Sequence, residues 1–429
     1  MKRILGFFLV ISLLLTCLMA FSSCDESPSV DTLLTYSPLS DGTYGVKVGR
    51  ASYLSEIVIP STYNGKPVTK ILDNAFYSCK GLKSIVIPDS VTSIGDRAFY
   101  GCKGLTSIVI PDSVTSIGNH AFRGCTNLTS VTIGDGVESI GNSAFRHCKG
   151  LDSIVIPDSV TSIGNRAFYG CTGLTSVYIS DIGAWCRISF SSSASNPLYY
   201  AKKLYLNGEL VTELVIPDSV TSIGNWAFYG CTGLTSIVIP DSVTSIGNWA
   251  FYGCKGLTSI VIPDSVTSIG NHAFRGCTGL AIYCEASSKP SEWKKLWSLS
   301  CPVVWGIDGI TEDGLVWLST DTAVTIAGYV GSVTEIVIPA AIDNMAVTSI
   351  GNHAFEDCKG LTSIVIPDSV TSIGSFAFRG CKELTSATFE NTTGWKADRA
   401  SLSADDLANT STAATYLTST YYKHAWTRE

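Results

Sequence analysis

The chain is poor in charge, and positive charge is the scarcer kind. Charged side chains make up 15% of the 429 residues, and 36 acidic residues against 29 basic ones give a net charge of -7. A protein that binds DNA, RNA or an anionic lipid surface needs a basic patch that neutralises phosphates. The composition therefore argues against a nucleic-acid partner and against broad contact with a membrane.

Groups of residues that carry chemistry are also scarce. The 15 cysteines include no Cys-x-x-Cys pair, and the 5 histidines lack the spacing of metal ligands. No Ser/His/Asp set, phosphate-binding glycine loop or paired carboxylate site stands out. We therefore predict no cofactor, no metal and no enzymatic activity.

Long hydrophobic runs are missing after the first residues. Lys2 and Arg3 start the chain, an apolar run covers residues 4–21, and small residues precede Cys24. This order is typical of an export signal, although an apolar run of about 18 residues is also near the shortest that spans a bilayer. We predict a cleaved signal peptide over residues 1–23, with a retained membrane anchor as the alternative.

Ser23-Cys24, followed by two acidic residues, resembles the processing site of a bacterial lipoprotein, whose cysteine is acylated. Phe21 departs from that pattern, because such sites usually carry Leu there. The resemblance implies that Cys24 carries the lipid and that residues 24–40 form a lipidated tether. The chain would then be an exported lipoprotein of the bacterial surface or outer membrane, in contact with the membrane through this anchor alone.

Ten of the cysteines mark a repeat, because consecutive members of each run lie 23 residues apart. The three runs are Cys79, Cys102, Cys125, Cys148 and Cys171, then Cys231, Cys254 and Cys277, then Cys358 and Cys381. A fixed period of this size is the signature of a solenoid, in which each unit buries its apolar side against its neighbours. We interpret these cysteines as small buried apolar residues.

Each repeat predicts one coil. Apolar residues alternate with polar or outward-facing ones over residues 105–110, and β-branched residues are frequent there. Pro111 ends this pattern, because proline cannot donate to a strand ladder. The pattern predicts a short strand. A turn and a second, shorter extended piece over residues 114–117 follow. We expect Gly118 to take a positive φ at the next corner. Asn119 is expected to cap a short helical turn at residues 121–125.

The repeated pattern Leu-x-x-Ile-x-Ile-Pro-x-x-Val-x-x-Ile-Gly-x-x-Ala-Phe-x-x-Cys, over about residues 50–390, resembles the BspA-like, or treponemal-type, leucine-rich repeat family. A Pro-x-x-Val corner and an Ala-Phe-x-x-Cys turn replace the Asn turn and long helix of ordinary leucine-rich repeats. The resemblance implies a right-handed repeat solenoid of 23-residue coils, β-rich with short helical turns, on a bacterial surface. It also implies adhesion to host matrix proteins or other bacteria.

Departures from the repeat predict the domain limits. Residues 41–71 and 313–350 both look like a hairpin that leads into a first coil. We therefore predict a first solenoid block over residues 41–306, in which residues 180–211 are one coil with an inserted loop. A second block follows over residues 307–390, with a C-terminal cap or tail over residues 391–429.

Cys284 and Cys301 lie outside the 23-residue register. They flank a helix-like segment at residues 293–297. We interpret them as a candidate disulfide.

Two sites of the Asn-x-Ala-Phe-x turn vary between otherwise similar repeats. Such sites must face solvent at least partly, and Tyr, Trp and Arg are the residues that anchor interfaces. The candidate ligand-binding residues are Trp226, Trp249, Tyr229, Tyr252, Tyr100, Tyr169, Arg123 and Arg275. The alternative is that these rings merely cover the flank of the next coil.

A second candidate surface is the outward side of the main strands, which repeats valine. These residues are Val86, Val109, Val155, Val238, Val261 and Val365. An exposed aliphatic stripe can mark an interaction face, and ordinary packing between neighbouring strands explains it equally well.

The leading hypothesis is a non-enzymatic cell-surface binding or adhesion protein. Its partner would be a host extracellular or matrix protein, or another bacterial surface protein, bound through one face of the solenoid. A glycan-binding surface module that uses the aromatic turn residues is one alternative. A structural spacer on the cell envelope, which holds residues 392–429 away from the membrane, is another.

Overall fold

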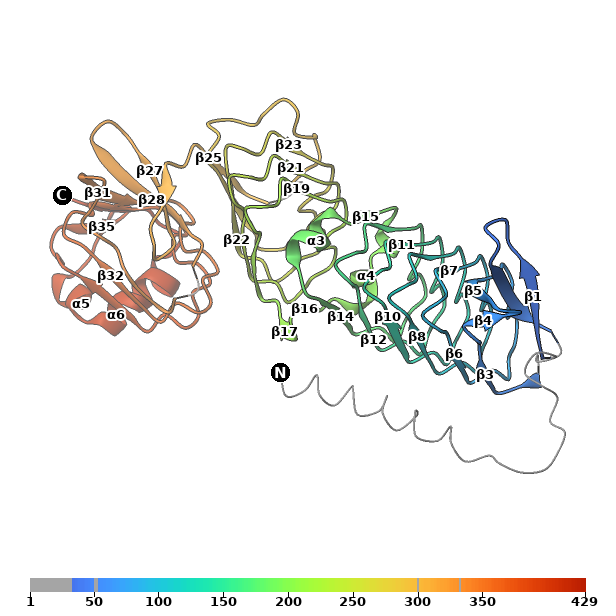
Figure 1. Ribbon diagram of the computed structural model, residues 1–429. Coiled ribbons are helices and arrows are strands. Elements are labelled where there is room, and N and C mark those ends of the chain that lie inside the picture. The colour runs from blue at the N-terminus through green and yellow to red at the C-terminus, as the bar shows by residue number, and fades with distance from the viewer. Residues whose placement is uncertain (1–32, 50–52, 299–300, 332) are drawn as a thin grey trace.

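The computed structural model describes residues 33–429 except residues 50–52, 299–300 and 332. The predicted signal peptide, Cys24 and residues 24–32 of the predicted tether lie outside the described residues. The rest forms an elongated stack of β-rich coils (Figure 1). The predicted repeat solenoid is therefore confirmed.

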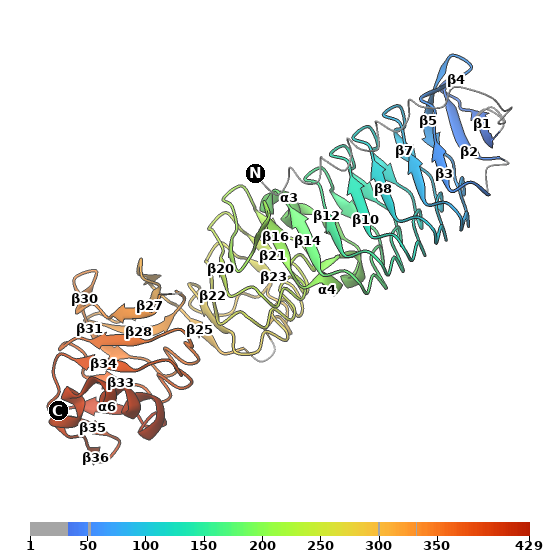
Figure 2. The ribbon, with the colours of Figure 1, turned by 90° about the horizontal axis from the view of Figure 1, so that it is seen from below.

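One main strand per coil forms the first face of the stack. Figure 2 shows β8, β10, β12 and β14 side by side. In the first block the main strands are β3 (Glu56–Val58), β6 (Ser84–Val86), β8 (Ser107–Ile110), β10 (Ser130–Ile133), β12 (Ser153–Val155), β14 (Ser176–Ile179), β16 (Leu204–Leu206), β18 (Glu213–Val215), β20 (Ser236–Val238), β22 (Ser259–Ile262), β24 (Ala281–Cys284) and β25 (Val303–Trp305). They pair in parallel one repeat apart, so that Ile108 lies opposite Val131.

A second, shorter strand in most coils forms another face. These strands are β7 (Ser93–Ile94), β9 (Ser116–Ile117), β11 (Ser139–Ile140), β13 (Ser162–Ile163), β15 (Ser189–Phe190), β19 (Ser222–Ile223), β21 (Ser245–Ile246) and β23 (Ser268–Ile269). The N-terminal end of the stack is covered by β1 (Leu34–Pro38), β2 (Tyr44–Val48), β4 (Thr62–Tyr63) and β5 (Lys66–Ile71), in which β1 and β4 run antiparallel to their neighbours. An antiparallel hairpin protects an edge that would otherwise template further strands.

The core repeats with the coils. The rings of Phe76, Phe99 and Phe122 stack with centroids 5.2 and 5.1 Å apart. The cysteines do more than fill space, because the Cys125 thiol donates a hydrogen bond to the carbonyl oxygen of Phe99, 3.1 Å away in the preceding coil. Every ladder cysteine that follows another in its run makes this bond, and the thiol thus satisfies a carbonyl group that is buried beside it.

Gly118 does not take the positive φ that the sequence suggested. A Cβ there would lie 2.5 Å from the carbonyl carbon of Gly95, so glycine is required because two coil backbones approach closely. The left-handed conformation falls two residues later, at His120, with φ 58°.

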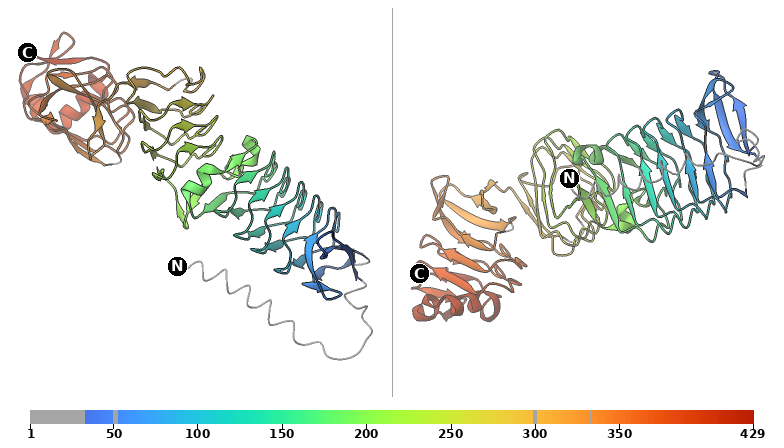
Figure 3. Two further views of the ribbon diagram at one scale, coloured as in Figure 1. Left: turned by 45° about the horizontal axis from the view of Figure 1, so that its top comes forward. Right: turned by 60° about the horizontal axis from the view of Figure 1, so that its bottom comes forward.

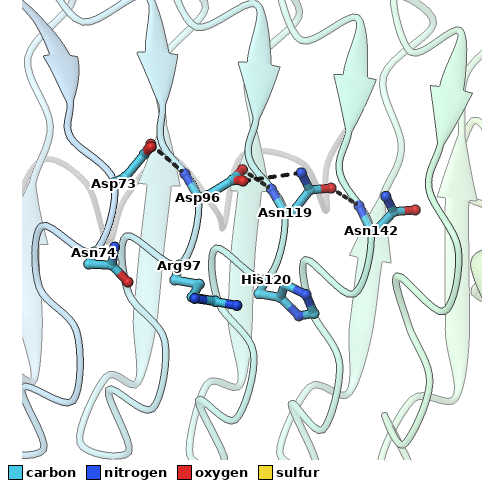
Figure 4. A pocket seen from close by; sticks show the side chains of 7 residues that line it. All are labelled: Asp73, Asn74, Asp96, Arg97, Asn119, His120 and Asn142. Atoms are coloured by element: carbon cyan, nitrogen blue, oxygen red, sulfur yellow. Dashed lines mark hydrogen bonds between the residues drawn. The ribbon is translucent and has the colours of Figure 1, made fainter.

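Asn119 does not cap its own turn either. Its Oδ1 accepts a hydrogen bond from the backbone N–H of Asn142 in the next coil, at 2.8 Å. Figure 4 shows the resulting ladder, in which the backbone N–H of Asn119 in turn donates to Asp96. The residue therefore joins coils instead of starting a helix.

Residues 180–211 form one irregular coil that interrupts both ladders of strands. It consists of α3 (Ile182–Arg187), β15, the 3-10 turn at Ser193–Ser195, α4 (Leu198–Ala201), β16 and β17 (Glu209–Leu210). β15 and β16 pair with the preceding coil, whereas β19 and β18 start separate sheets. Buried Asn196 bridges the break, because its side-chain amide donates to the carbonyl oxygens of Trp226 and Ala227.

The second block has its own core and repeats the architecture of the first. Its strands are β26 (Gly309–Ile310), β27 (Leu315–Ser319), β28 (Ala323–Tyr329), β29 (Glu335–Val337), β30 (Ala341–Ile342), β31 (Met345–Ile350), β32 (Ser363–Ile366), β33 (Ser372–Ile373) and β34 (Ser386–Phe389). Figure 3 shows this block beyond the first, with the helices of the C-terminal cap at its far end.

The C-terminal segment closes the stack. It contains β35 (Trp395–Ala397), β36 (Ala400–Ser401), α5 (Ala404–Ala408), α6 (Thr410–Thr415), a π-helical turn at Tyr416–Thr420 and β37 (Trp426–Arg428). β37 pairs antiparallel with β33 and covers that strand's edge. None of the helices in the described part of the chain is long and apolar enough to cross a membrane.

The two blocks meet through a small cluster of Tyr283, Ile307 and Val316. The Tyr283 side chain lies against Gly328, where a Cβ would fall 1.9 Å from its hydroxyl oxygen. Each block starts with a hairpin, and strand register aligns the two hairpins. Thr35 and Lys47 of the first hairpin occupy the positions that Val316 and Gly328 occupy in the second hairpin. The first hairpin thus presents polar residues where the second docks onto a preceding block.

Gly118→Ala is expected to destabilise the first block by about 1–3 kcal/mol, because the added methyl group meets backbone that cannot move aside. Urea unfolding measures this change. Gly233→Ala is the matched control, since a Cβ there meets no atom within 4 Å. Equal stabilities of the two variants would contradict the close-approach explanation.

Gly328→Lys, which copies the residue of the first hairpin, is expected to separate the two blocks while each core stays folded. Small-angle X-ray scattering should then report a larger radius of gyration. Lys47→Gly is the control and should leave the radius unchanged. An unchanged radius in Gly328→Lys would show that the Tyr283 contact does not hold the blocks together.

Candidate functional site: the aromatic edge

Two predicted residues, Trp226 and Trp249, lie on adjacent coils of the first block. Their rings are parallel within 3° with centroids 5.4 Å apart, and His272 continues the row at 5.4 Å from Trp249. All three side chains are half-buried. The structure therefore brings the two tryptophans together as a short ladder on the surface.

The backbone under this ladder is unusual. Trp226 and Trp249 have φ of 58° and 53°, in the left-handed region that bulky residues seldom adopt. Such a conformation costs roughly 1–2 kcal/mol per residue. Arg97 and Ser143 hold the same position in other coils, so the fold does not require an aromatic ring there.

A second ladder runs beside the first. The rings of Tyr229 and Tyr252 stack with centroids 4.8 Å apart, three residues after each tryptophan. Burial and the neighbouring Tyr252 hydroxyl raise the pKa of Tyr229 to about 12, so its hydroxyl remains a hydrogen-bond donor at neutral pH.

The inserted coil extends this second ladder with residues that the sequence reasoning missed. Tyr199 stacks on Tyr229 at 5.7 Å, and the Lys202 ammonium lies 5.4 and 5.6 Å from the centroids of these two rings. The repeat pattern cannot align these residues, because residues 180–211 leave the 23-residue register. The adjacent pair Tyr199-Tyr200 was the available signal. We call Trp226, Trp249, His272, Tyr199, Tyr229, Tyr252 and Lys202 the aromatic edge.

The remaining candidates lie elsewhere on the same turn. Arg123 lies over the ring of Tyr100 at 5.5 Å, three coils before the inserted coil at which the aromatic edge begins. Tyr169 is contacted by Arg146 at 5.2 Å. Arg275 is exposed and follows Tyr252 in the next coil, where its carbonyl oxygen accepts from Gly253. The eight candidates thus do not form one patch.

In the second block the turn is ionic. His353 contacts Glu356, which also pairs with Arg379. His353 stacks on Phe376 at 5.2 Å. The aromatic edge is therefore a local feature of the coils around residues 199–275 rather than a property of every repeat.

Stacking decides which part of each ring can meet a partner. Trp249 lies between Trp226 and His272, and Tyr229 lies between Tyr199 and Tyr252, so neighbouring rings lie against both faces of these two rings and not against their edges. Face-on binding of a sugar requires an open ring face. A protein surface, in contrast, can pack against ring edges and form hydrogen bonds with the tyrosine hydroxyl groups. The geometry suits a protein surface better.

The predicted disulfide between Cys284 and Cys301 is wrong. Cys284 is a free buried thiol at the end of β24. The Cys301 sulfur lies 3.8 Å from the carbonyl oxygen of Phe274, at the place of the next ladder cysteine. Residues 293–297 are turns instead of a helix, and Trp297 ends the phenylalanine stack by packing edge-on against Phe274.

The valine stripe is exposed along much of the main strands. Val86, Val109 and Val155 are about half exposed, at 55%, 50% and 51%. Val261, in contrast, packs against the cluster that joins the two blocks. Part of the predicted second face is therefore covered by the protein itself.

Among the described residues, no group of three or more His, Cys, Asp or Glu side chains could hold a metal ion. A shallow depression does lie along the asparagine ladder, lined by Asp73, Asn74, Asp96, Arg97, Asn119, His120 and Asn142 (Figure 4). Its polar groups are engaged largely with one another, through hydrogen bonds between successive coils.

Parallel strands one repeat apart, with a leucine and isoleucine core, define a leucine-rich repeat solenoid. The model of the BspA type leucine rich repeat region matches six copies over residues 51–195, 201–287 and 329–412. The chain therefore belongs to the BspA-type leucine-rich repeat family.

Solved structures of bacterial leucine-rich repeat proteins also resemble the chain, with identities of 26% to 28%. A leucine rich cell surface protein from Faecalibacterium prausnitzii is 28% identical, with 86% of this chain and 77% of that chain covered and a TM-score of 0.31. The leucine rich repeat protein of T. pallidum is 27% identical over 60% and 91% of the two chains, with a TM-score of 0.29. One from Bacteroides ovatus is 26% identical over 86% and 94%, with a TM-score of 0.31. No curated protein matches the chain.

Burial raises the pKa of the Cys125 thiol from 9.0 to about 12. The neutral thiol is favoured in the folded state, so its stabilising effect is complete below pH 9 and is lost as the pH rises towards 12. We expect the free energy of unfolding to fall with pH above 9, by up to about 1.4 kcal/mol per pH unit for this thiol.

The test compares urea unfolding of the wild type and of Cys125→Ala at pH 8, 9 and 10. The curve of the alanine variant should fall less steeply, because one titrating thiol is gone. Parallel curves would contradict the assignment of this alkaline loss to the buried thiol.

Proposed function

We propose that this chain is a non-enzymatic binding protein of the bacterial surface, and that the aromatic edge captures a protein partner. The partner class is a host extracellular or matrix protein, or a surface protein of another bacterium. The resemblance of the N-terminus to a lipoprotein processing site supports export and anchoring through acylated Cys24.

One observation carries the proposal. Trp226 and Trp249 keep large aromatic rings on a left-handed backbone, at a position where other coils manage with Ser or Arg. The positive φ belongs to this position in every regular coil, where Asn74 and Ser143 also adopt it, so the fold requires a residue that tolerates it and not a large ring. Tryptophans at this position in two adjacent coils point to a role in binding. Tyr199, Tyr229 and Tyr252 stand beside them, and Tyr and Trp are the residue types most enriched at interface hot spots.

The same geometry ranks the alternatives. A glycan-binding module would need open ring faces, and stacking covers these faces within both ladders. A pure spacer would need length and rigidity but no aromatic residues on a strained turn. Protein binding therefore explains more of the structure than either alternative does.

The test uses the soluble chain from Ser27 onward in solid-phase binding to purified extracellular matrix proteins and to whole bacterial cells. The double variant Trp226→Asn/Trp249→Asn is expected to bind its protein ligand at least tenfold more weakly, since hot-spot truncation costs about 2 kcal/mol or more. Asparagine tolerates positive φ, so the coil should remain folded, which circular dichroism checks.

His353→Asn is the matched control, because it changes the same turn position in the second block, where φ is 60°. Its binding should equal that of the wild type. Undiminished binding by the double variant would overturn the aromatic edge as the site. A glycan array on which the wild type binds and the double variant does not would favour the glycan alternative.

A further inference from the structure

Exposed charges of the first five coils are separated between the two ends of the main strands. The turns that follow the strands carry acidic side chains and no Lys or Arg. We call this row the acidic corner, and its residues are Asp89, Asp112, Asp135, Glu138 and Asp158, all exposed.

The turns that precede the same strands are basic. We call this row the basic edge, and it consists of Lys80, Lys83, Arg97, Lys103, Arg123, Arg146, Lys149 and Arg166. Asp152 is the single acidic residue in the sequence between each variable turn and its strand, and Asp73 and Asp96 lie directly before the turns of the first two coils, where they line the same depression as Arg97. Arg123 and Arg146 are half-buried against tyrosine rings, and the others are exposed.

The two rows lie on opposite sides of the stack. A main strand such as residues 105–111 separates them by about 20 Å. Parallel, in-register pairing repeats this arrangement in each coil, so that Ser107 lies opposite Ser130 and Ser153 opposite Ser176. The phenylalanine rings give the coil spacing as 5.1 to 5.5 Å, and both rows share it.

No ion pair among the described residues neutralises either row. All ion pairs found among the described residues lie after residue 350, in the second block and its cap. Within the described part of the chain, the carboxylates of Asp89, Asp135 and Glu138 accept no hydrogen bond, whereas Asp112 and Asp158 accept one each. The ammonium groups of Lys80, Lys103 and Lys149 likewise donate none there. Two uncompensated rows of opposite charge with one common spacing fit each other coil by coil.

We propose that the acidic corner of one chain docks on the basic edge of a second copy. Because the two rows face opposite sides, the contact is head-to-tail and does not close on itself, so further copies can add to form a row. Translation without rotation keeps all copies pointing the same way, which suits chains fixed to one surface. The aromatic edge lies in later coils and is left open to the partner proposed above.

Sedimentation velocity of the chain from Ser27 onward tests this association. At 50 mM salt the wild type should shift to larger species as its concentration rises. At 500 mM salt it should sediment as a monomer, because screening weakens exposed charge pairs. A monomer at every concentration and salt, or an association that salt does not weaken, would overturn the proposal.

Two charge reversals sharpen the test without removing an intramolecular bond. Asp89→Lys/Asp135→Lys/Glu138→Lys leaves three lysines against Asp112 and Asp158 in the acidic corner, so that both sides are basic. Lys80→Glu/Lys83→Glu/Lys103→Glu/Lys149→Glu leaves four arginines against four glutamates and Asp152 on the basic edge, so that both sides are acidic. Each of the two variants alone should stay monomeric at 50 mM salt, and an equimolar mixture should associate. A mixture that stays monomeric, with both variants folded by circular dichroism, contradicts the pairing of these rows.

Two further arms separate this proposal from others. Trp226→Asn/Trp249→Asn should self-associate like the wild type, so that failure of the aromatic edge and failure of self-association are distinguishable. Binding of the wild-type basic edge to heparin, with no self-association, would assign that edge to an acidic polymer instead of a second copy and overturn the proposal.

Discussion

Close contact between equivalent positions of successive coils is the constraint on which this structure depends. Gly118 lies so near the backbone of the preceding coil that a methyl group does not fit. At the same corner, Asn119 accepts a hydrogen bond from the next coil, and the Cys125 thiol reaches back to the coil before. Because each contact joins positions that recur in successive coils, the 23-residue period of the sequence becomes a fixed spacing in space.

That spacing turns single residues into rows. A phenylalanine or a tryptophan that recurs once per repeat stacks on its counterpart, with ring centroids 5.1 and 5.4 Å apart, and an asparagine accepts a hydrogen bond from its counterpart. Stacking stabilises each row and also limits its chemistry, because ring faces are used within the protein. The surface that remains for partners includes ring edges, exposed charges and the valine stripe of the main strands.

The irregular segments of the chain end the rows of repeated residues and make one row differ from another. The segment over residues 180–211 stops both ladders of strands, yet it contributes Tyr199 and Lys202 to the aromatic edge. The hairpin of the second block packs on Tyr283 through Val316 and Gly328, whereas Thr35 and Lys47 keep the first hairpin polar. The two hairpins are similar in fold, and a few side chains decide that only the second one packs on a preceding block.

The sequence by itself determined the coil, its strands, the buried cysteines and the variable turn, since each follows from local pattern and from an exact period. It pointed to Trp226, Trp249, Tyr229 and Tyr252 for the same reason. It could not assign Gly118 or Asn119 correctly, because both serve contacts between coils and a single repeat does not contain them. The place of Cys301 in the ladder, the arrival of Tyr199 beside Tyr229 and the docking of Tyr283 on Gly328 were decided by the tertiary structure, because they join residues that share no register in the chain.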